Sequence, residues 1–206
     1  MSNAPAWLRT LIALAACALA VTHVNAAVQE FTLDPARTTV SFEVRNFGVF
    51  TERGRFAGAA GSGMLDPAAS DGSLNVVIDA RSLRASNSAK ERFLLGRGML
   101  NAESFPEITY EAKRVLFDDE QPVRIDGELT LLGVTRPVSL AIVAYGCVRT
   151  DTMSRCLLDA SATFRRSDFG MNRYLTVASD EVTLTIRTEL EQRPARAAKV
   201  PSARSL

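Results

Sequence analysis

The sequence predicts an all-β fold, either an antiparallel barrel or a sandwich. Apolar and polar residues alternate along much of the chain, as expected for strands with one buried face and one solvated face. Short polar segments with Asp, Gly and Pro separate these strands, and frequent strands joined by short turns are typical of both folds. The alternating apolar residues are Val40, Phe42, Val44, Ile108, Tyr110, Val123, Ile125, Leu140, Ile142, Val182, Leu184 and Ile186.

Residues 1–26 have the layout of a secretory signal peptide. Arg9 precedes an unbroken apolar run over residues 11–21, and the chain then turns polar before the small residue Ala26. The apolar run is about half of the ~20 residues that a membrane-spanning helix needs. We therefore predict cleavage near Ala26 and a periplasmic location. The alternative is a lipoprotein acylated on Cys17, because the residues before it resemble a lipobox.

The only histidine of the chain, His23, lies within this segment. The processed protein would therefore have no histidine for a Ser-His-Asp relay, a zinc site or a general base near neutral pH. The 24 basic and 23 acidic side chains nearly balance, so the chain lacks the basic footprint of a nucleic-acid-binding protein. We expect no cofactor, no metal and no nucleic-acid partner.

Cys147 and Cys156 are the cysteines that remain after processing. They flank a polar segment between two apolar strands, and in an exported protein this arrangement predicts a disulfide that closes a hairpin. A redox or metal-binding thiol pair is the alternative, but the spacing is not C-x-x-C and no other soft ligands accompany it.

Residues 86–105 interrupt the alternation and predict one or two short helices, inserted between strands and lying across a barrel mouth. Ala89, Phe93 and Leu94 have helical spacing, and Asn87 or Ser88 can cap the first helix. The segment around Met99 and Leu100 is the candidate second helix. Three carboxylates near this insert are candidate acid/base groups or, in the alternative, solvated charges: Glu91, Glu103 and Glu107.

Glycines crowd residues 53–66, as they do in phosphate-binding loops. Strands are predicted on both sides, whereas a phosphate loop leads into a helix, so we expect a bent or bulged barrel strand. A second local cluster covers residues 165–171. Here we expect an ion pair between Arg166 and Asp168, a buried Phe169 and an unusual backbone angle at Gly170.

Residues 192–206 contain four basic side chains, two prolines and no acid after Gln192. They predict a disordered basic tail beyond a barrel domain of residues 27–191. Contact of this tail with anionic lipid or a cell-surface polymer is the alternative to simple solvation.

The chain resembles the YceI family of exported polyisoprenoid-binding proteins from about Phe31 to Leu190. The resemblance implies an eight-stranded antiparallel lipocalin-like barrel that encloses a long isoprenoid chain. Members commonly carry histidines where this chain has Arg37, Asn46 and Phe93, which we place near the barrel mouth. The matching stretches are 33–44, 54–56, 104–110, 127–138, 166–170 and 182–184.

From this resemblance and the alternation we predict a non-catalytic protein that binds an isoprenoid lipid or quinone inside the barrel. Core packing is the alternative role for each apolar candidate. Candidate wall residues are Phe42, Val44, Phe56, Val76, Ile78, Phe93, Phe105, Ile108, Tyr110, Leu129, Leu131, Phe164 and Phe169, and the polar candidates are Arg37 and Arg166.

Two rival functions stay open. One is an enzyme acting on a lipid or quinone, with Glu91, Tyr110 or Asp168 as the base. The other is an empty, packed barrel that serves as an envelope stress or adhesion module. The sequence also leaves the oligomeric state open, including a homodimer.

Overall fold

The computed structural model describes residues 28–66, 69, 71–119, 121–149 and 154–194. The predicted signal peptide, Cys17 and residues 195–206 of the predicted tail lie outside the described residues. The elements are β1 (Gln29–Leu33), η2 (Pro35–Arg37), β2 (Thr39–Asn46), β3 (Phe50–Ala57), β4 (Ala59–Asp66), β5 (Asp71–Asp79), η3 (Ala80–Ser82), β6 (Leu83–Ala85), α1 (Ser88–Leu95), β7 (Glu107–Asp118), β8 (Gln121–Leu131), β9 (Val134–Arg149), β10 (Ser154–Arg165), η4 (Arg166–Phe169) and β11 (Ala178–Pro194).

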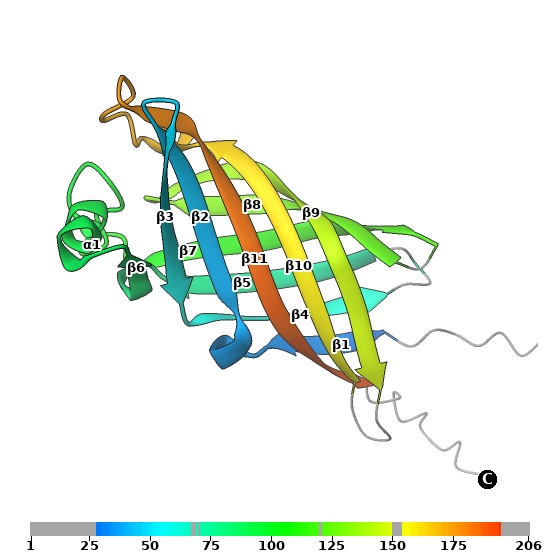
Figure 1. Cartoon of the computed structure of the whole chain (residues 1–206). Helices are drawn as coiled ribbons and strands as arrows, with labels where there is room; N and C mark the ends of the chain where they lie inside the picture. Colours follow the sequence, from blue (N-terminus) through cyan, green and yellow to red (C-terminus); the bar gives the residue numbers. More distant parts are fainter. Residues whose placement is uncertain (1–27, 67–68, 70, 120, 150–153, 195–206) are drawn as a thin grey trace, which may run out of the picture.

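Eight antiparallel strands close into a barrel, in the order β1-β4-β5-β7-β8-β9-β10-β11 and back to β1 (Figure 1). The closing contact pairs Phe31 of β1 with Gln192 of β11. The eight-stranded antiparallel barrel predicted from the sequence is therefore confirmed. β11 runs on to Pro194, so residues 192–194 of the predicted tail belong to the barrel wall.

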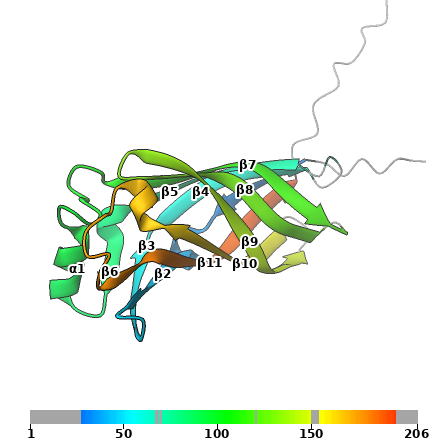
Figure 2. The same ribbon diagram turned by 90° about the horizontal axis from the view of Figure 1, so that it is seen from above.

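At the opposite end of β11, the wall continues through β2, β3 and β6. No pairing joins β6 to β7 within the described sheet, and the chain between them carries α1 at this end of the barrel (Figure 2). We call this end the mouth. Helix α1 confirms the first predicted helix, and Asn87 caps it by accepting a hydrogen bond from the Lys90 backbone N–H at 3.0 Å. Residues 97–100 form turns, so the second candidate helix is wrong.

Two bends separate the first four strands of the chain, one between β1 and β2 and one between β3 and β4. Asp34 caps the short helix η2 between β1 and β2, accepting from the Ala36 N–H at 2.9 Å, and Pro35 opens that helix. Between β3 and β4, Gly58 adopts a φ of +80°, a left-handed conformation that glycine tolerates. The glycine-rich segment therefore forms two strands that meet at a bend, rather than the single bent or bulged strand that we expected.

Two other glycines in these strands make room for aromatic rings. A Cβ atom at Gly54 would stand 2.4 Å from Phe42, and one at Gly63 would stand 2.5 Å from Phe31. Each ring lies on a strand that pairs with its glycine. The glycines therefore allow the rings to lie close against the barrel wall.

The alternation in β8 departs from the prediction at Val123, which is 42% exposed, whereas Pro122 and Ile125 are buried. The pairing of β7 with β8 shifts register between Leu116 and Phe117. A bulge of this kind moves the residues beyond it to the other face of the strand. The expectation that Val123 faces the interior is therefore wrong.

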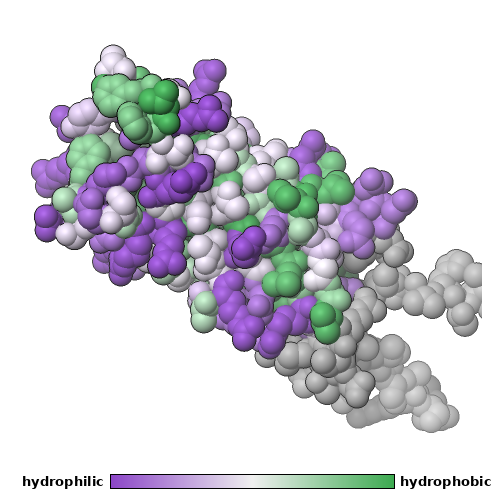
Figure 3. All heavy atoms as spheres, viewed as in Figure 1, coloured by the Kyte–Doolittle hydropathy of each residue, from purple (hydrophilic) through white to green (hydrophobic). Residues whose placement is uncertain are grey.

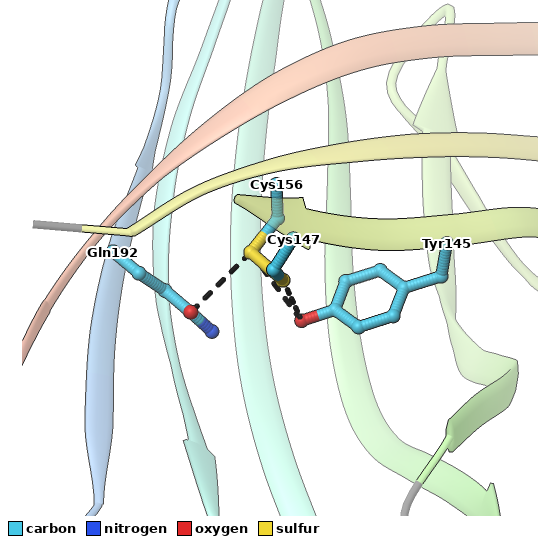
Figure 4. Close-up of a disulfide and its surroundings, with 4 residues drawn as sticks. All are labelled: Tyr145, Cys147, Cys156 and Gln192. Carbon is cyan, nitrogen blue, oxygen red and sulfur yellow. Dashed lines mark hydrogen bonds between the residues drawn. A yellow bond between two sulfur atoms is a disulfide. The ribbon is translucent and has the colours of Figure 1, made fainter. Parts of the chain in front are cut away.

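The predicted disulfide is present between Cys147 of β9 and Cys156 of β10, which are directly opposed in the hairpin. Cys156 is fully buried, and the Tyr145 hydroxyl lies 3.1 Å from the sulfur of Cys147 (Figure 4). Gln192 Oε1 approaches Cys156 Sγ at 3.3 Å from β11. The bridge therefore sits at the end of the barrel opposite the mouth, beside the strand that closes it.

Among the described residues, no helix has the length and apolar character to cross a membrane.

Candidate ligand-binding site

Three cavities follow one another along the barrel interior. The inner cavity lies toward the disulfide, the middle cavity follows it, and the mouth cavity opens beside α1. Their volumes are about 90, 110 and 270 Å³. A water molecule needs about 10–15 Å³ by the same measure, so the interior is hollow rather than packed.

Shared residues join the cavities into one passage. The inner and middle cavities share Val40, Ile78, Leu129 and Leu184. The middle and mouth cavities share Phe42, Val44, Leu94, Met99 and Arg166.

The inner cavity is almost wholly apolar. Its few polar wall groups have hydrogen-bond partners on the protein: Thr38 and Thr188 are buried and join their hydroxyl groups at 2.7 Å, and Thr38 also donates to the Asp34 carbonyl. The Tyr110 hydroxyl lies 2.9 Å from the carbonyl oxygen of Val138. Burial, and then the negative charge of Asp126, raises the pKa of Tyr110, so its phenol stays neutral. Polar groups satisfied in this way leave an apolar surface for a ligand.

The mouth cavity is the most polar part of the passage. Lys90 of α1 forms an ion pair with Glu52 of β3 across it. Phe93 of α1 packs against Tyr174, with ring centroids 5.5 Å apart. Asn46 and Phe93 both line this cavity, so these two residues lie at the mouth as expected.

Arg166 is the buried cation of the passage, with 3% of its surface exposed. Its guanidinium donates to four backbone carbonyls at 2.7–3.2 Å, and the acceptors are Met171, Arg173, Ala178 and Ser179. A guanidinium has five N–H groups, and these bonds use four of them. Burial lowers the pKa of Arg166, while the nearby charge of Asp180 opposes that shift.

The expected ion pair between Arg166 and Asp168 is wrong, because no such bridge occurs among the described side chains. Asp180 takes that place in the cluster: it accepts from the Ser167 hydroxyl at 2.7 Å and the Ser167 N–H at 2.9 Å. Phe169 is buried and meets Phe164 edge to face, and Gly170 has a φ of +85°. Sequence reasoning missed Asp180 because it lies on β11, beyond the local motif.

The structure brings most of the predicted wall residues together around the passage. Phe105, Phe169 and Arg37 are not among the residues that line it: Phe105 covers Gly133, and Arg37 donates to Glu189 at 2.7 Å on the outside of η2. Arg37 therefore lies away from the mouth where we had placed it. The predicted residues that line the cavities are Phe42, Val44, Phe56, Val76, Ile78, Phe93, Ile108, Tyr110, Leu129, Leu131, Phe164 and Arg166.

Some residues that line the cavities were not among the predicted wall residues, although the alternation of two of them was visible in the sequence. Leu184 and Ile186 alternate on β11 and face the cavities. Leu94 and Met99 enter the wall from the helical insert, and no strand periodicity marks them.

The candidate catalytic groups do not converge. Tyr110 faces the inner cavity, the Glu91 carboxylate accepts from the Ala85 N–H at 3.2 Å, and Asp168 is exposed on η4. Within the described part of the chain, no group of three or more Cys, Asp or Glu side chains is arranged to hold a metal ion.

A closed antiparallel barrel with a hollow apolar interior defines a class of small-ligand-binding proteins. The family model for the YceI-like domain matches residues 31–190, and the chain belongs to this family. A UPF0312 protein of Enterobacter sp. (strain 638) is 31% identical over 189 residues, which cover 88% of this chain and 96% of that protein. A UPF0312 protein of Yersinia pestis (strain Pestoides F) is 29% identical over 187 residues, with the same coverage.

Solved structures share the fold. Burkholderia cenocepacia BcnA superposes with a TM-score of 0.64 at 19% identity, over 76% of this chain and 98% of that one. A polyisoprenoid binding domain from Saccharophagus degradans, implicated in plant cell wall breakdown, gives a TM-score of 0.57 at 16% identity, over 80% and 98% of the two chains.

Proposed function

We propose that this protein binds an isoprenoid lipid or an isoprenoid quinone inside its barrel and does not catalyse a reaction. The observation that carries the proposal is the passage of three cavities joined by shared, mostly apolar residues. A slim branched hydrocarbon chain suits such a passage, because each buried CH₂-sized group contributes about 0.8 kcal/mol before ordering costs.

The distribution of polarity supports one orientation of the ligand. The hydrocarbon chain occupies the inner and middle cavities, and the polar head lies at the mouth. There the remaining N–H of Arg166 offers a hydrogen bond to a head-group oxygen. Arg166 would then be the polar contact to the ligand that the sequence predicts.

A periplasmic location is part of the proposal. A disulfide with one fully buried cysteine is consistent with an oxidising compartment, and the predicted signal peptide would direct the chain there. The polyisoprenoid binding domain among the solved relatives supports the same ligand class.

Mass spectrometry of organic extracts tests the proposal. The full chain is expressed with its own leader, purified from the periplasm without detergent and extracted, and we expect a recurrent polyprenyl species. Leu184→Trp should remove that species, because Leu184 lies where the inner and middle cavities meet. Val143→Trp, at a residue 70% exposed on β9, is the matched control and should retain it.

Two results would refute the proposal. One is a folded wild-type protein that repeatedly yields no lipid. The other is Leu184→Trp protein that retains the lipid at the wild-type ratio, which would place the ligand outside the barrel. The enzyme alternative needs a separate readout: turnover of the extracted lipid that falls in Glu91→Gln while lipid binding stays intact.

A further inference from the structure

Exposed apolar side chains surround the mouth of the barrel. Phe47 and Val49 lie on the turn between β2 and β3, and Phe50 is the first residue of β3; they are 69%, 76% and 68% exposed. Tyr174, Leu175 and Phe93 lie on the two neighbouring segments and are 48%, 43% and 50% exposed. We call these six residues the mouth rim. Figure 3 shows a hydrophobic cluster at the upper left, where Figure 1 places the β2–β3 turn and the loop before β11.

The backbone holds the rim in this exposed arrangement. Phe47 and Tyr174 have φ values of +51° and +62°, a left-handed conformation that is unfavourable for aromatic residues. The Phe47 N–H donates to the Val177 carbonyl at 2.7 Å and joins the turn to the loop. Strained backbone conformations concentrate at functional sites, and here they hold two aromatic side chains at the surface of the mouth.

The rim is continuous with the proposed binding passage. Phe47, Phe93 and Tyr174 line the mouth cavity as well as the outer surface. The apolar side chains of the rim are therefore continuous with those of the cavity wall, beside the Lys90–Glu52 ion pair.

The charges around the rim complement an anionic surface. The segments that contain the rim residues have six basic side chains and two acidic ones. These segments are residues 45–53, 90–97 and 172–176. Both acids have partners, and so do two of the six bases: Glu52 pairs with Lys90, Arg53 pairs with Glu43, and Glu91 accepts from the Ala85 N–H. Arg45, Arg92 and Arg173 are exposed, so each can face lipid phosphate.

We propose that the mouth rim docks onto the surface of an anionic phospholipid bilayer, with the aromatic side chains in the interface and the arginines at the phosphates. This inference deepens the proposed function, since a bilayer is where a barrel would collect or release an apolar lipid. Apolar insertion combined with attraction to anionic lipid is the usual basis of reversible interfacial binding.

Vesicle sedimentation tests the docking. The full chain is expressed with its own leader, and the protein purified from the periplasm is mixed with vesicles of phosphatidylcholine alone or with added phosphatidylglycerol. We expect stronger binding to the anionic vesicles and a loss of binding as salt is added. Val49→Ser combined with Phe50→Ser should weaken the partition at least about tenfold, because both side chains are already exposed, neither lines the mouth cavity, and their apolar surface is lost only from the docked state.

Val143→Ser combined with Val148→Ser is the matched control, at residues 70% and 72% exposed on β9. It should bind vesicles as the wild type does. Three results would overturn the docking: no vesicle binding by the wild type, equal loss in both double variants, or a wild-type dimer in lipid-free buffer that Val49→Ser with Phe50→Ser abolishes. The last result would mean that a second copy covers the rim. Deletion of residues 195–206 tests whether the predicted tail is responsible for vesicle binding. Loss of vesicle binding in this variant would also overturn docking through the rim.

Lipid extracts of the same variants separate this inference from the proposed function. If the rim variant keeps its co-purified lipid but loses vesicle binding, both proposals stand. If no variant carries lipid and the rim still directs vesicle binding, docking stands and the ligand proposal fails. If lipid is present and the rim variant binds vesicles normally, only docking fails.

Discussion

The ring of Tyr110 on β7 lies so close over Gly127 of β8 that a Cβ atom at Gly127 would stand 2.6 Å from Cζ of the ring. The Tyr110 hydroxyl reaches across β8 to the carbonyl of Val138 on β9. One side chain thus connects three neighbouring strands of the barrel, and the missing side chain of Gly127 makes this possible.

Gly127→Ala should lower the free energy of unfolding by about 1–3 kcal/mol, because the added methyl group meets both the Tyr110 ring and the Glu111 carbonyl. Urea denaturation measures the change. Gly146→Ala is the control, since a Cβ atom there would have no neighbour within 4 Å. Equal losses in the two variants would contradict the close contact between Tyr110 and Gly127.

The stability of the barrel should fall at alkaline pH because of Tyr110. Burial raises the pKa of this phenol above its ordinary value of 10.0, so the folded state favours the neutral form more than the unfolded state does. The contribution of Tyr110 is fully present below pH 10.0 and is lost as the pH rises through the higher folded-state pKa.

Urea midpoints measured over this alkaline range check that expectation. Tyr110→Phe should cost about 1 kcal/mol at neutral pH through the lost hydrogen bond and should flatten the alkaline dependence. Tyr145 and Tyr174 remain in both proteins and report any general effect of tyrosine ionisation. An unchanged alkaline slope in Tyr110→Phe would assign the dependence to other groups.

Ser167 should control part of the acid stability through Asp180. The Ser167 hydroxyl is the largest cause that holds the pKa of Asp180 below 3.8, with its backbone N–H and the charge of Arg166 acting in the same direction. A carboxyl with a depressed pKa stabilises the fold above its unfolded pKa, and this contribution disappears as the pH falls. Ser167→Ala should reduce the stability difference between neutral and acid pH in urea titrations, whereas Ser161→Ala on β10 should leave it unchanged.

Arg166→Met should destabilise the protein by at least about 3 kcal/mol, because it leaves backbone carbonyls at the mouth without their charged donor. Hydrogen exchange should rise first in residues 171–179, which the guanidinium holds together. Arg165→Met, at the exposed neighbouring residue, should have a small effect. Similar exchange in the two variants would show that Arg166 does not organise this loop.

Replacing Cys147 by Ser and Cys156 by Ala should lower the free energy of unfolding by about 2–3 kcal/mol, the value expected for a short closed loop. The effect should concentrate in the β9–β10 hairpin, as local hydrogen exchange would report, and lipid content should persist. Loss of co-purified lipid in this variant would instead assign the disulfide end a direct part in binding.

Much of the fold could be predicted because the alternation is local information. Val40, Phe42 and Leu184 face the interior as their spacing indicates. Val123 does not, because a bulge depends on how two strands align and leaves no mark in one strand alone. The partner of Ser167 was missed for a similar reason, since Asp180 lies on another strand.

The sequence by itself determined the all-β class, the disulfide pair and the alternating apolar wall, since each follows from the period of a strand or the spacing of two residues. Only the tertiary structure decided that the wall encloses connected cavities, that Arg166 is anchored by carbonyls, and that Arg37 lies away from the mouth. Whether an apolar residue packs against a neighbour or lines a void depends on the curvature and closure of the sheet, which arise from pairings between distant segments.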